Sequence, residues 1–519
     1  MDVLDIFSGQ VKVIARLDRG EEIYFTVAPA DFRAACLFLH KELAAPVALM
    51  SASDDRKENN SFGLICCFRS NSLRKWVFVK TAVDFASASF EALSSAIYSA
   101  SRFEREIKEN FGIEPHGAPD TRRLRLHDEV WPKGYYPLRK DFMMPPAGGG
   151  GLSAYQFVRG EGKGIFEVPV GPVHAGIIGP GHFRFSCAGE PIINLEIRLG
   201  FTHKGVEKLF EGKGVEAARL AECVDGEASF SHSLAFCRSL EKISGIEPSQ
   251  RARELRALFL ELERMFNHAS DIAGIALDVG FSFPASLAAI IKENIQRANE
   301  RLTGSRFLKG VNVPGGVLRD VDEGQKKYLL ATLDSVKKDF RLLRSMLLES
   351  VSFMDRVEAT GVLKRKTAVD LGVTGLAARA CGIQQDLRKD FGEEIYGQMR
   401  FRPACEQSGD VLARLQVRFF EFEESLRIIR LLAAILPAGE LRENFVPAPG
   451  FALGFAEGWR GPVLYWVKTG GTGVIERCKI VDPSFLNWQG LAYSVLGDII
   501  PDFPVCNKSF DLSYPGNDL

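Results

Sequence analysis

Two prolines and four consecutive glycines interrupt the chain at residues 144–153, MPPAGGGGLS. Proline removes a backbone donor and glycine loses much conformational freedom on folding, so neither a helix nor a strand continues cheaply through this segment. We therefore expect a linker at 144–153 between a first domain at 1–143 and a second domain at 154–519. This division suits a chain of 519 residues, which is too long for one hydrophobic core.

Composition and charge exclude several classes of protein. Hydrophobic residues make up 46% of the chain and charged residues 25%, an ordinary globular balance. The formal net charge of -1 offers no basic surface, so we expect no nucleic-acid partner. No uninterrupted apolar run reaches the roughly 18 residues of a membrane-spanning helix. The start, MDVLDIFSGQ, has no basic flank before an apolar core, and the ten cysteines contain no C-x-x-C pair, so we expect a reducing cytoplasm.

The first domain has the patterns of a mixed α/β fold. Short runs rich in Val, Ile and Phe at 10–27 and 61–83 predict strands. Apolar residues at three- and four-residue steps predict helices at 30–42 and 87–110. Residues 111–142 are rich in Pro, Gly and charge, which indicates an extended arm.

The second domain is predicted to be mainly helical between two strand regions. Strands are expected at 164–200 and again at 450–480, around a turn at 469–472. Between 203 and 439 the pattern is mostly helical. The long periodic helices are expected at 252–266, 285–302, 325–355 and 410–436. The fold class is therefore α+β.

The end of the first domain carries a specific motif. It reads FEREIKENFGIEPHGAPDTRRLRL, followed by YYPLRKDF. This order resembles the 30-kDa-type subunit of complex I, whose signature is E-R-E…F-G-I-x-F-x-G-H-P-D-x-R-R-x-L and then P-L-R-K-D. The match departs from the signature at Ala118, where the family has histidine.

Five motifs of the second domain follow one another in a known order. They are GPVHAGIIGPGHFRF, FTHKGVEKLFEGK, RELRALFLELERMFNHASDIAGIALDVG, GVTGLAARACGIQQDLRKDF and RCKIVDPSFLNWQGL. Together they resemble the 49-kDa subunit of complex I and the large subunit of nickel–iron hydrogenases, which share one fold. The fused arrangement resembles group 4 hydrogenases of the formate-hydrogenlyase type. The resemblance covers nearly the whole chain and implies an α/β domain of 30-kDa type joined to a mainly helical domain with small β-sheets at its ends.

The cysteines that hold the nickel–iron pair in that family are missing. The family supplies them as C-G-x-C-x-x-x-H, here aligned on His232, and as D-P-C-x-x-C, here DPSFLN. The four ligand positions then hold Asp225, Ala228, Ser484 and Asn487. Because a low-valent nickel–iron pair needs soft thiolates, we expect no metal and no other cofactor in this chain.

The place of the missing metal has two interpretations, and both stay open. Asp225, Glu227 and Asn487 line a polar cavity, or they form an internally hydrogen-bonded patch without function. In complex I the corresponding cavity holds the quinone headgroup, bound by an H-P-x-x-H-G loop and a tyrosine. Here His174 matches the first histidine of that loop, His182 lies in a shifted GPGHFR, and the tyrosine position falls at Val224, which has no hydroxyl.

The resemblance and the residue chemistry together give the candidate site. Its members are His174, His182, Glu207, Asp225, Glu227 and His232. Histidine changes charge near neutral pH, and Glu207 matches a carboxylate that the family keeps on a proton route. The alternatives are ordinary loop histidines and a charged surface helix. Arg264, His268 and Asp271 share one helix face, where packing and contact with other subunits are the favoured roles.

The resemblance implies a peripheral-arm subunit on the cytoplasmic face of the inner membrane. Its expected partners are a small iron–sulfur subunit and antiporter-like and complex I-like membrane subunits. The expected activity resembles NADH:quinone oxidoreductase, with electron transfer coupled to ion translocation, no nickel–iron centre and quinone as a candidate acceptor. A non-catalytic scaffold is the alternative, and an active hydrogenase is disfavoured. Since hydrogenases are trimmed after metal loading, we expect this chain to stay uncut after its last motif.

Overall fold

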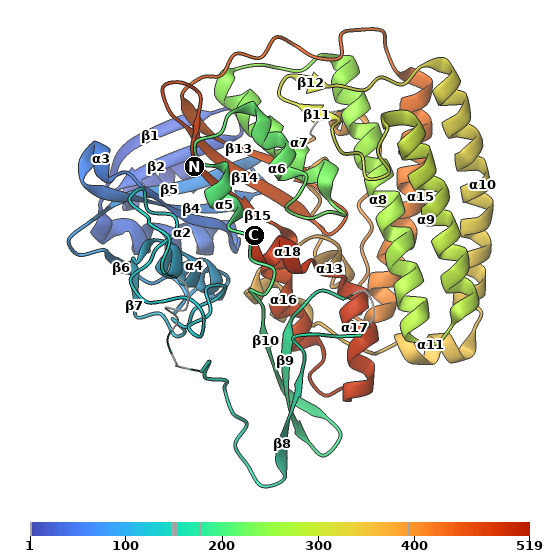
Figure 1. The fold of residues 1–519 in the computed structure, drawn as a ribbon, viewed down its shortest axis with the longest axis horizontal. Coiled ribbons are helices and arrows are strands. Elements are labelled where there is room, and N and C mark those ends of the chain that lie inside the picture. The colour runs from blue at the N-terminus through green and yellow to red at the C-terminus, as the bar shows by residue number, and fades with distance from the viewer. Residues whose placement is uncertain (1–2, 147–150, 152–153, 176–177, 393–394) are drawn as a thin grey trace.

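A computed structural model describes residues 3–146, 151, 154–175, 178–392 and 395–519. Most of the expected linker, residues 147–150 and 152–153, therefore lies outside the described residues. An N-terminal sheet with its helices forms one side of the molecule and a group of long helices forms the other (Figure 1). A three-stranded sheet from the C-terminal part lies between them. The expected α+β class is confirmed.

The N-terminal sheet has the strand order β1-β2-β5-β4-β3. Its neighbours are antiparallel except β2 and β5, which are parallel. The strands are β1 (Val13–Arg19), β2 (Glu22–Val27), β3 (Val47–Asp54), β4 (Ser61–Ser70) and β5 (Lys75–Asp84). The helix α2 (Phe32–Leu43) packs on this sheet through its apolar face. The strands and the helix expected here from the sequence are thus confirmed. The structure adds β3, which was not expected.

The helix expected at 87–110 is wrong in its first half. A strand β6 (Ser89–Glu91) pairs there with β7 (Glu114–His116), and helix α4 (Ser101–Phe111) begins only at Ser101. The physical reason is that the backbone N–H groups of Leu93 and Ser94 donate to the buried carboxylate of Glu104, at 2.5 and 3.2 Å, rather than to a helix ladder.

After Phe111, the last residue of α4, the arm at 111–142 contains no helix and only one short strand, as expected, but it is packed against the domain. Leu124, Leu126 and Leu138 are buried. The carboxylate of Glu109 accepts from the backbone N–H groups of Leu124 and Arg125, at 2.8 and 3.0 Å. The packing was not expected, because a polar composition does not reveal a buried carboxylate that satisfies loop backbone.

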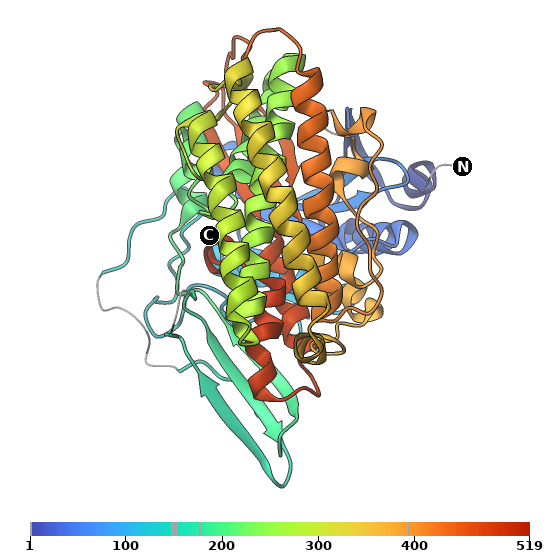
Figure 2. The same cartoon turned by 90° about the vertical axis from the view of Figure 1, so that its right-hand side faces the viewer.

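The second domain begins with a projecting sheet and continues into long helices. The strands β8 (Ile165–Val170), β9 (His182–Ala188) and β10 (Ile192–Arg198) form the projection in Figures 1 and 2, where strands were expected. The long helices are α7 (Ser229–Ser244), α8 (Gln250–Asp278), α9 (Ser282–Thr303), α10 (Glu323–Leu348) and α15 (Val411–Ile435). Among the described helices, none combines the length and the apolar composition that a membrane span requires.

The expected long helices are confirmed with two differences: the helix expected at 252–266 continues to Asp278, and the helix expected at 325–355 is broken. Residues 325–355 form two helices, because α10 ends at Leu348 and Ser350 caps a new helix α11 (Val351–Val357) by accepting from the N–H of Phe353. The shorter elements are α1 (Val3–Gln10), α3 (Arg56–Asn59), α5 (Val206–Phe210), α6 (Ala218–Ala221), α12 (Arg365–Leu371), α13 (Gly375–Ala380), α14 (Leu387–Asp390), β11 (Asn312–Val313) and β12 (Gly316–Val317).

The central sheet consists of β13 (Gly450–Glu457), β14 (Pro462–Thr469) and β15 (Ile475–Val481), where strands were expected. Alternate residues point to opposite faces. Phe455 and Trp466 join the core of the N-terminal domain, whereas Tyr465 and Val467 join the core of the helical domain. The sheet therefore buries both faces and holds the two halves of the chain together.

The C-terminal tail is part of the interior. It contains α16 (Pro483–Ser494), α17 (Phe503–Phe510) and α18 (Tyr514–Asp518). The buried Asp518 carboxylate accepts from the N–H groups of Gly200 and Thr202, at 2.8 and 2.9 Å. Asn517 binds the N-terminal domain, since its carboxamide oxygen accepts from Arg102 Nη2 at 2.6 Å.

We expect Gly454→Val to destabilise the molecule. A Cβ atom at Gly454 of β13 would lie 2.0 Å from the carbonyl oxygen of Ala235 in α7, so the central sheet and this helix meet at backbone distance. Overpacking should lower the free energy of unfolding by about 1–3 kcal/mol, measured by denaturant titration. Gly471→Ala is the matched control, because a Cβ there meets nothing within 4 Å. Equal stability of both variants would contradict the packing described.

Candidate functional site

Arg460, in the turn between β13 and β14, gathers three carboxylates around its guanidinium. Nη1 lies 2.5 Å from Asp225 Oδ2, and Nη2 lies 3.0 Å from Glu227 Oε2 and 3.4 Å from Asp511 Oδ2. The ring of Trp459 covers the guanidinium, with 3.9 Å from Cζ to the ring centroid. The side chains of Arg460 and Asp225 are 6% and 4% exposed, and that of Glu227 is 48% exposed. Glu227 therefore connects a buried ion pair with the surface.

The charged groups around Arg460 keep one another ionised. Burial alone would lower the pKa of Arg460, but the carboxylates of Asp225 and Asp511 outweigh it and raise that pKa. Burial would raise the pKa of Asp511, and the neighbouring cations of Lys508 and Arg460 lower it below its usual range. Lys508 Nζ lies 2.8 Å from Asp511 Oδ1. Arg460 and Asp511 are therefore both charged at neutral pH.

His232 joins the start of α7 to the start of α16. Its Nε2 lies 3.1 Å from Asp482 Oδ2 and its Nδ1 lies 2.9 Å from the hydroxyl of Tyr465. Burial would raise the pKa of Asp482, but the hydrogen bond and charge of His232 and the charge of Arg460 lower it. The other oxygen of Asp482 accepts from the N–H of Ser484 at 2.7 Å and caps α16. His232 thus holds Asp482, and with it the start of α16, against Tyr465 of the central sheet.

The side chains of Ser484 and Asn487, at two of the predicted ligand positions, form hydrogen bonds with backbone groups. Ser484 Oγ accepts from the N–H of Ser513 at 2.9 Å. The carboxamide of Asn487 accepts from the N–H of Thr374 at 2.9 Å and donates to its carbonyl oxygen at 3.1 Å. Within the described part of the chain, neither side chain has a hydrogen bond or ion pair with Asp225. For Asn487, these contacts match the interpretation as an internally hydrogen-bonded group.

A segment that the sequence analysis missed reaches Arg460 instead. Residues 511–516, DLSYPG, have the same aspartate and the same spacing as D-P-C-x-x-C, with Ser513 and Gly516 at the cysteine positions. Asp511 is the residue that pairs with Arg460. Ser513 Oγ accepts from the N–H of Gly516 at 2.9 Å and caps α18. The Asp-x-Ser pattern at 511–513 repeats the one at 482–484 and could have revealed this segment. The alignment chose 482–487 because Asp482 and Pro483 match both the aspartate and the proline of the family motif.

The loop with the two candidate histidines lies against this tail. His174 Nε2 is 2.7 Å from the carbonyl oxygen of Gly181, and His182 Nδ1 is 3.3 Å from that of Gly171. A Cβ atom at Gly179 would lie 2.6 Å from the ring of Tyr514, so the loop packs on the residue after Ser513. Burial lowers the pKa of His182. Both histidines are bound to loop backbone, beside the tail and outside the Arg460 group.

Glu207 belongs to a different group of charges. Its carboxylate lies 2.8 Å from Arg477 and 3.1 Å from Lys479, and accepts from the N–H of Ile480 at 3.0 Å. Burial would raise the pKa of Glu207, but these cations lower it to about 2. Lys479 also lies 2.6 Å from Glu106 of α4. Glu207 thus joins the two domains as a permanent anion.

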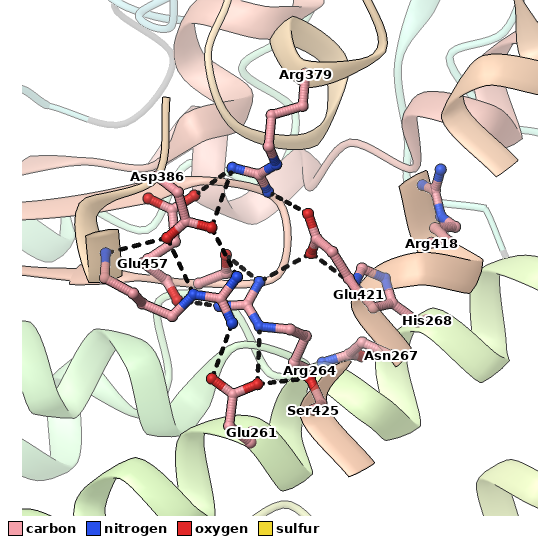
Figure 3. A network of polar contacts seen from close by, with 12 residues as sticks. Glu261, Arg264, Asn267, His268, Arg379, Asp386, Arg418, Glu421, Ser425 and Glu457 are labelled. Carbon is pink, nitrogen blue, oxygen red and sulfur yellow. Dashed lines mark hydrogen bonds and ion pairs between the residues drawn. The ribbon is translucent and has the colours of Figure 1, made fainter. Parts of the chain in front are cut away.

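A further set of buried charges lies along α8 (Figure 3). Its members are Glu261, Arg264, His268, Arg379, Asp386, Arg388, Glu421 and Glu457. Arg379 lies 2.8 Å from both Glu421 and Glu457. Burial lowers the pKa of His268 to about 4, which leaves its ring neutral. Asp271, one turn further along α8, lies 2.8 Å from Arg418. The helix face singled out in the sequence therefore makes contacts inside this chain.

The residues at the ligand positions do not fit a nickel–iron pair. They offer a carboxylate at Asp225, a methyl at Ala228 and no sulfur in either register of the second motif. The guanidinium of Arg460 already pairs with Asp225, and a fixed cation there opposes a metal cation. Among the described residues, no three His, Cys, Asp or Glu side chains are grouped to hold a metal ion.

Comparison with known proteins agrees with the resemblance found in the sequence. Residues 25–147 match the family described as respiratory-chain NADH dehydrogenase, 30 Kd subunit, and residues 278–446 match the 49 Kd subunit. A solved relative is the membrane-bound sulfane sulfur reductase, described as an archaeal respiratory membrane complex. It has 27% identity and a TM-score of 0.65, covering 69% of this chain and 99% of that chain.

Two curated relatives from Escherichia coli match over most of both chains. Formate hydrogenlyase subunit 5 is 32% identical and hydrogenase-4 component G is also 32% identical. The alignments cover 93% and 91% of this chain, and 86% and 83% of the relatives. An NADH-quinone oxidoreductase polypeptide of Phocaeicola vulgatus is 30% identical over 74% of this chain and 78% of its own. The chain therefore belongs to the family of group 4 hydrogenase-type large subunits, in which a 30-kDa-type part is fused to a 49-kDa-type part.

Proposed function

We propose that this subunit of a complex I-like, membrane-bound assembly works in electron transfer without a nickel–iron centre. A small iron–sulfur subunit supplies the electrons, and antiporter-like membrane subunits on the other side couple the reaction to ion translocation. The chain itself lies on the cytoplasmic face. The observation that carries the proposal is the ion pair of Arg460 with Asp225, which puts a permanent cation beside the position aligned with the family's first metal thiolate.

The Arg460 group suits the reduction of a bound acceptor. Reduction puts negative charge on the acceptor. Because Asp225, Glu227 and Asp511 already balance Arg460, the group offers fixed, preorganised ion pairs beside the acceptor rather than an unbalanced cation. Protons must follow the electrons. Glu227 is half exposed and touches Arg460, so it is the group placed to pass protons from solvent to the site.

Quinone is the acceptor class that the relatives favour. Several of the relatives are named as NADH-quinone oxidoreductase subunits. Quinone takes two electrons and two protons to become quinol. His174 lies on the loop that packs against Tyr514, next to the tail segment that carries Asp511. Val224 offers no hydroxyl, so the headgroup must be held by other donors than in complex I.

We also propose that the second ligand motif of the family corresponds to residues 511–516 rather than 482–487. The support is the contact of Asp511 with Arg460 and, through it, with Asp225. In this register the lost cysteines fall at Ser513 and Gly516. Either register leaves the site without a thiolate.

Glu227→Gln should lower the turnover of the assembled complex by about 100-fold, because the amide cannot carry a proton. The measurement is quinone-dependent reoxidation of the reduced iron–sulfur partner, followed spectroscopically in the purified complex. Glu323→Gln is the matched control, since Glu323 is an 88% exposed acid on α10. Assembly and control turnover should be unchanged. Unaltered turnover in both Glu227→Gln and Asp225→Ala would instead identify the chain as a scaffold.

The purified complex should contain no stoichiometric nickel, and the chain in it should keep its last residues. The physical reason is that no thiolate is available and that α17 and α18 are built into the interior. Elemental analysis and intact-protein mass spectrometry on one preparation test both points. One nickel per chain, or a cut soon after Asn487 or Gly516, would contradict the proposal.

A further inference from the structure

A cavity of about 450 Å³ lies between α4, β10, α16 and the residues near 119–124. Its volume is in the range of small-molecule sites. The lining includes aliphatic side chains, namely Leu195, Leu199, Ala492 and Leu496. It also includes five arginines, namely Arg102, Arg105, Arg122, Arg123 and Arg198, and the carboxylates of Asp120 and Glu196. The cavity thus offers both apolar and charged surface.

Four of the five arginines are already neutralised by carboxylates. The pairs are Arg105 with Asp120 at 3.3 Å, Arg122 with Glu196 at 2.7 Å, Arg123 with Asp128 at 3.3 Å and Arg198 with Glu129 at 2.6 Å. These arginines also donate to backbone carbonyls or stack on tyrosine rings. They build the wall and leave no unbalanced charge there.

Arg102 differs in lacking a carboxylate partner, although its guanidinium lies over the ring of Phe485, with 4.9 Å from Cζ to the ring centroid. It is 8% exposed, and its one hydrogen-bond partner in the described part of the chain is the neutral carboxamide of Asn517. No carboxylate among these residues forms an ion pair with it, and its Nε is buried without a partner. Burial and the charge of Arg105 lower its pKa to about 9, so it is still a cation at neutral pH. The nearby Asp518 carboxylate is taken by the backbone of Gly200 and Thr202.

A buried cation that lacks a counter-charge is costly, and an anion that enters the cavity removes that cost. We propose that the cavity binds a small monocarboxylate with an apolar body, its carboxylate on Arg102 and its body against Leu195, Leu199 and Leu496. One unbalanced guanidinium calls for one negative charge, and the planar fork of arginine matches a carboxylate. A phosphate dianion would need a second unbalanced cation, which the wall lacks.

The site is separate from the Arg460 group, so its test does not depend on the proposed redox function. It is linked to the tail, however, because Asn517 of α18 is the present partner of Arg102. A ligand on Arg102 therefore acts directly on the contact that holds α18 against the N-terminal domain.

Isothermal titration of the purified complex with hexanoate tests the proposal, with hexanamide and inorganic phosphate as comparison probes. We expect hexanoate to bind at one site per chain, at least tenfold tighter than either other probe. Arg102→Gln should weaken hexanoate binding at least tenfold. Leu496→Trp, which fills the cavity without altering Arg102, should weaken it similarly. Arg297→Gln, a 67% exposed arginine on α9, is the matched control and should bind as the unaltered protein does.

Each contrary result overturns the proposal in a distinct way. Equal binding of hexanamide would show an apolar pocket without anion recognition. Tighter binding of phosphate would replace the carboxylate with a phosphate ligand. Hexanoate binding that survives both Arg102→Gln and Leu496→Trp would put the ligand elsewhere. A side chain of another protein seated on Arg102 in a structure of the assembled complex would make the cavity an assembly interface.

Discussion

The central sheet β13–β15 is the element on which the rest of the molecule depends, because it has no solvent face. Its alternating side chains enter the N-terminal core on one side and the helical core on the other. A shift of one residue in register would exchange the two sets, so the pairing is strongly specified. The same sheet fixes the candidate site. Arg460 lies in the first turn of the sheet, Tyr465 in its middle strand and Asp482 just after its last strand.

Buried charges along α8 fix the turn that carries Arg460. Arg264 donates to the carbonyl oxygens of Glu457 and Gly458, at 2.6 and 3.2 Å, on either side of the end of β13. In this network (Figure 3), buried arginines pair with Glu261, Asp386, Glu421 and Glu457, and His268 is neutral. Burial and the charge of Asp386 raise the pKa of Glu457, so this carboxyl keeps its proton more readily than a free glutamate does. Removing one partner of such a pair costs about 3–5 kcal/mol.

The long elements were predictable from periodicity, and the contacts of single side chains were not. The helices at α8, α9, α10 and α15 and both strand regions of the second domain follow from patterns of 3.6 and 2 residues. The helix expected at 87–110 was wrong in its first half because one buried carboxylate, Glu104, takes backbone donors locally. At the site, the motif alignment predicted Asp225, Glu227 and His232. It missed Arg460 and Asp511, since an isolated arginine in a turn has no pattern before the fold brings it to Asp225.

A guanidinium and a nickel–iron pair support different chemistry. A nickel–iron pair changes its oxidation state, whereas Arg460 keeps one charge at any working potential and pH. The Arg460 group therefore stores no electrons, and on the proposed function the electrons must pass between a partner's cluster and a bound acceptor. What the chain contributes is a set of fixed charges: Arg460 with Asp225 and Asp511 inside the protein, and Glu227 half exposed beside them. On the proposed function, fixed charges of this kind would tune the acceptor's affinity for electrons and protons together, as coupling to ion movement requires.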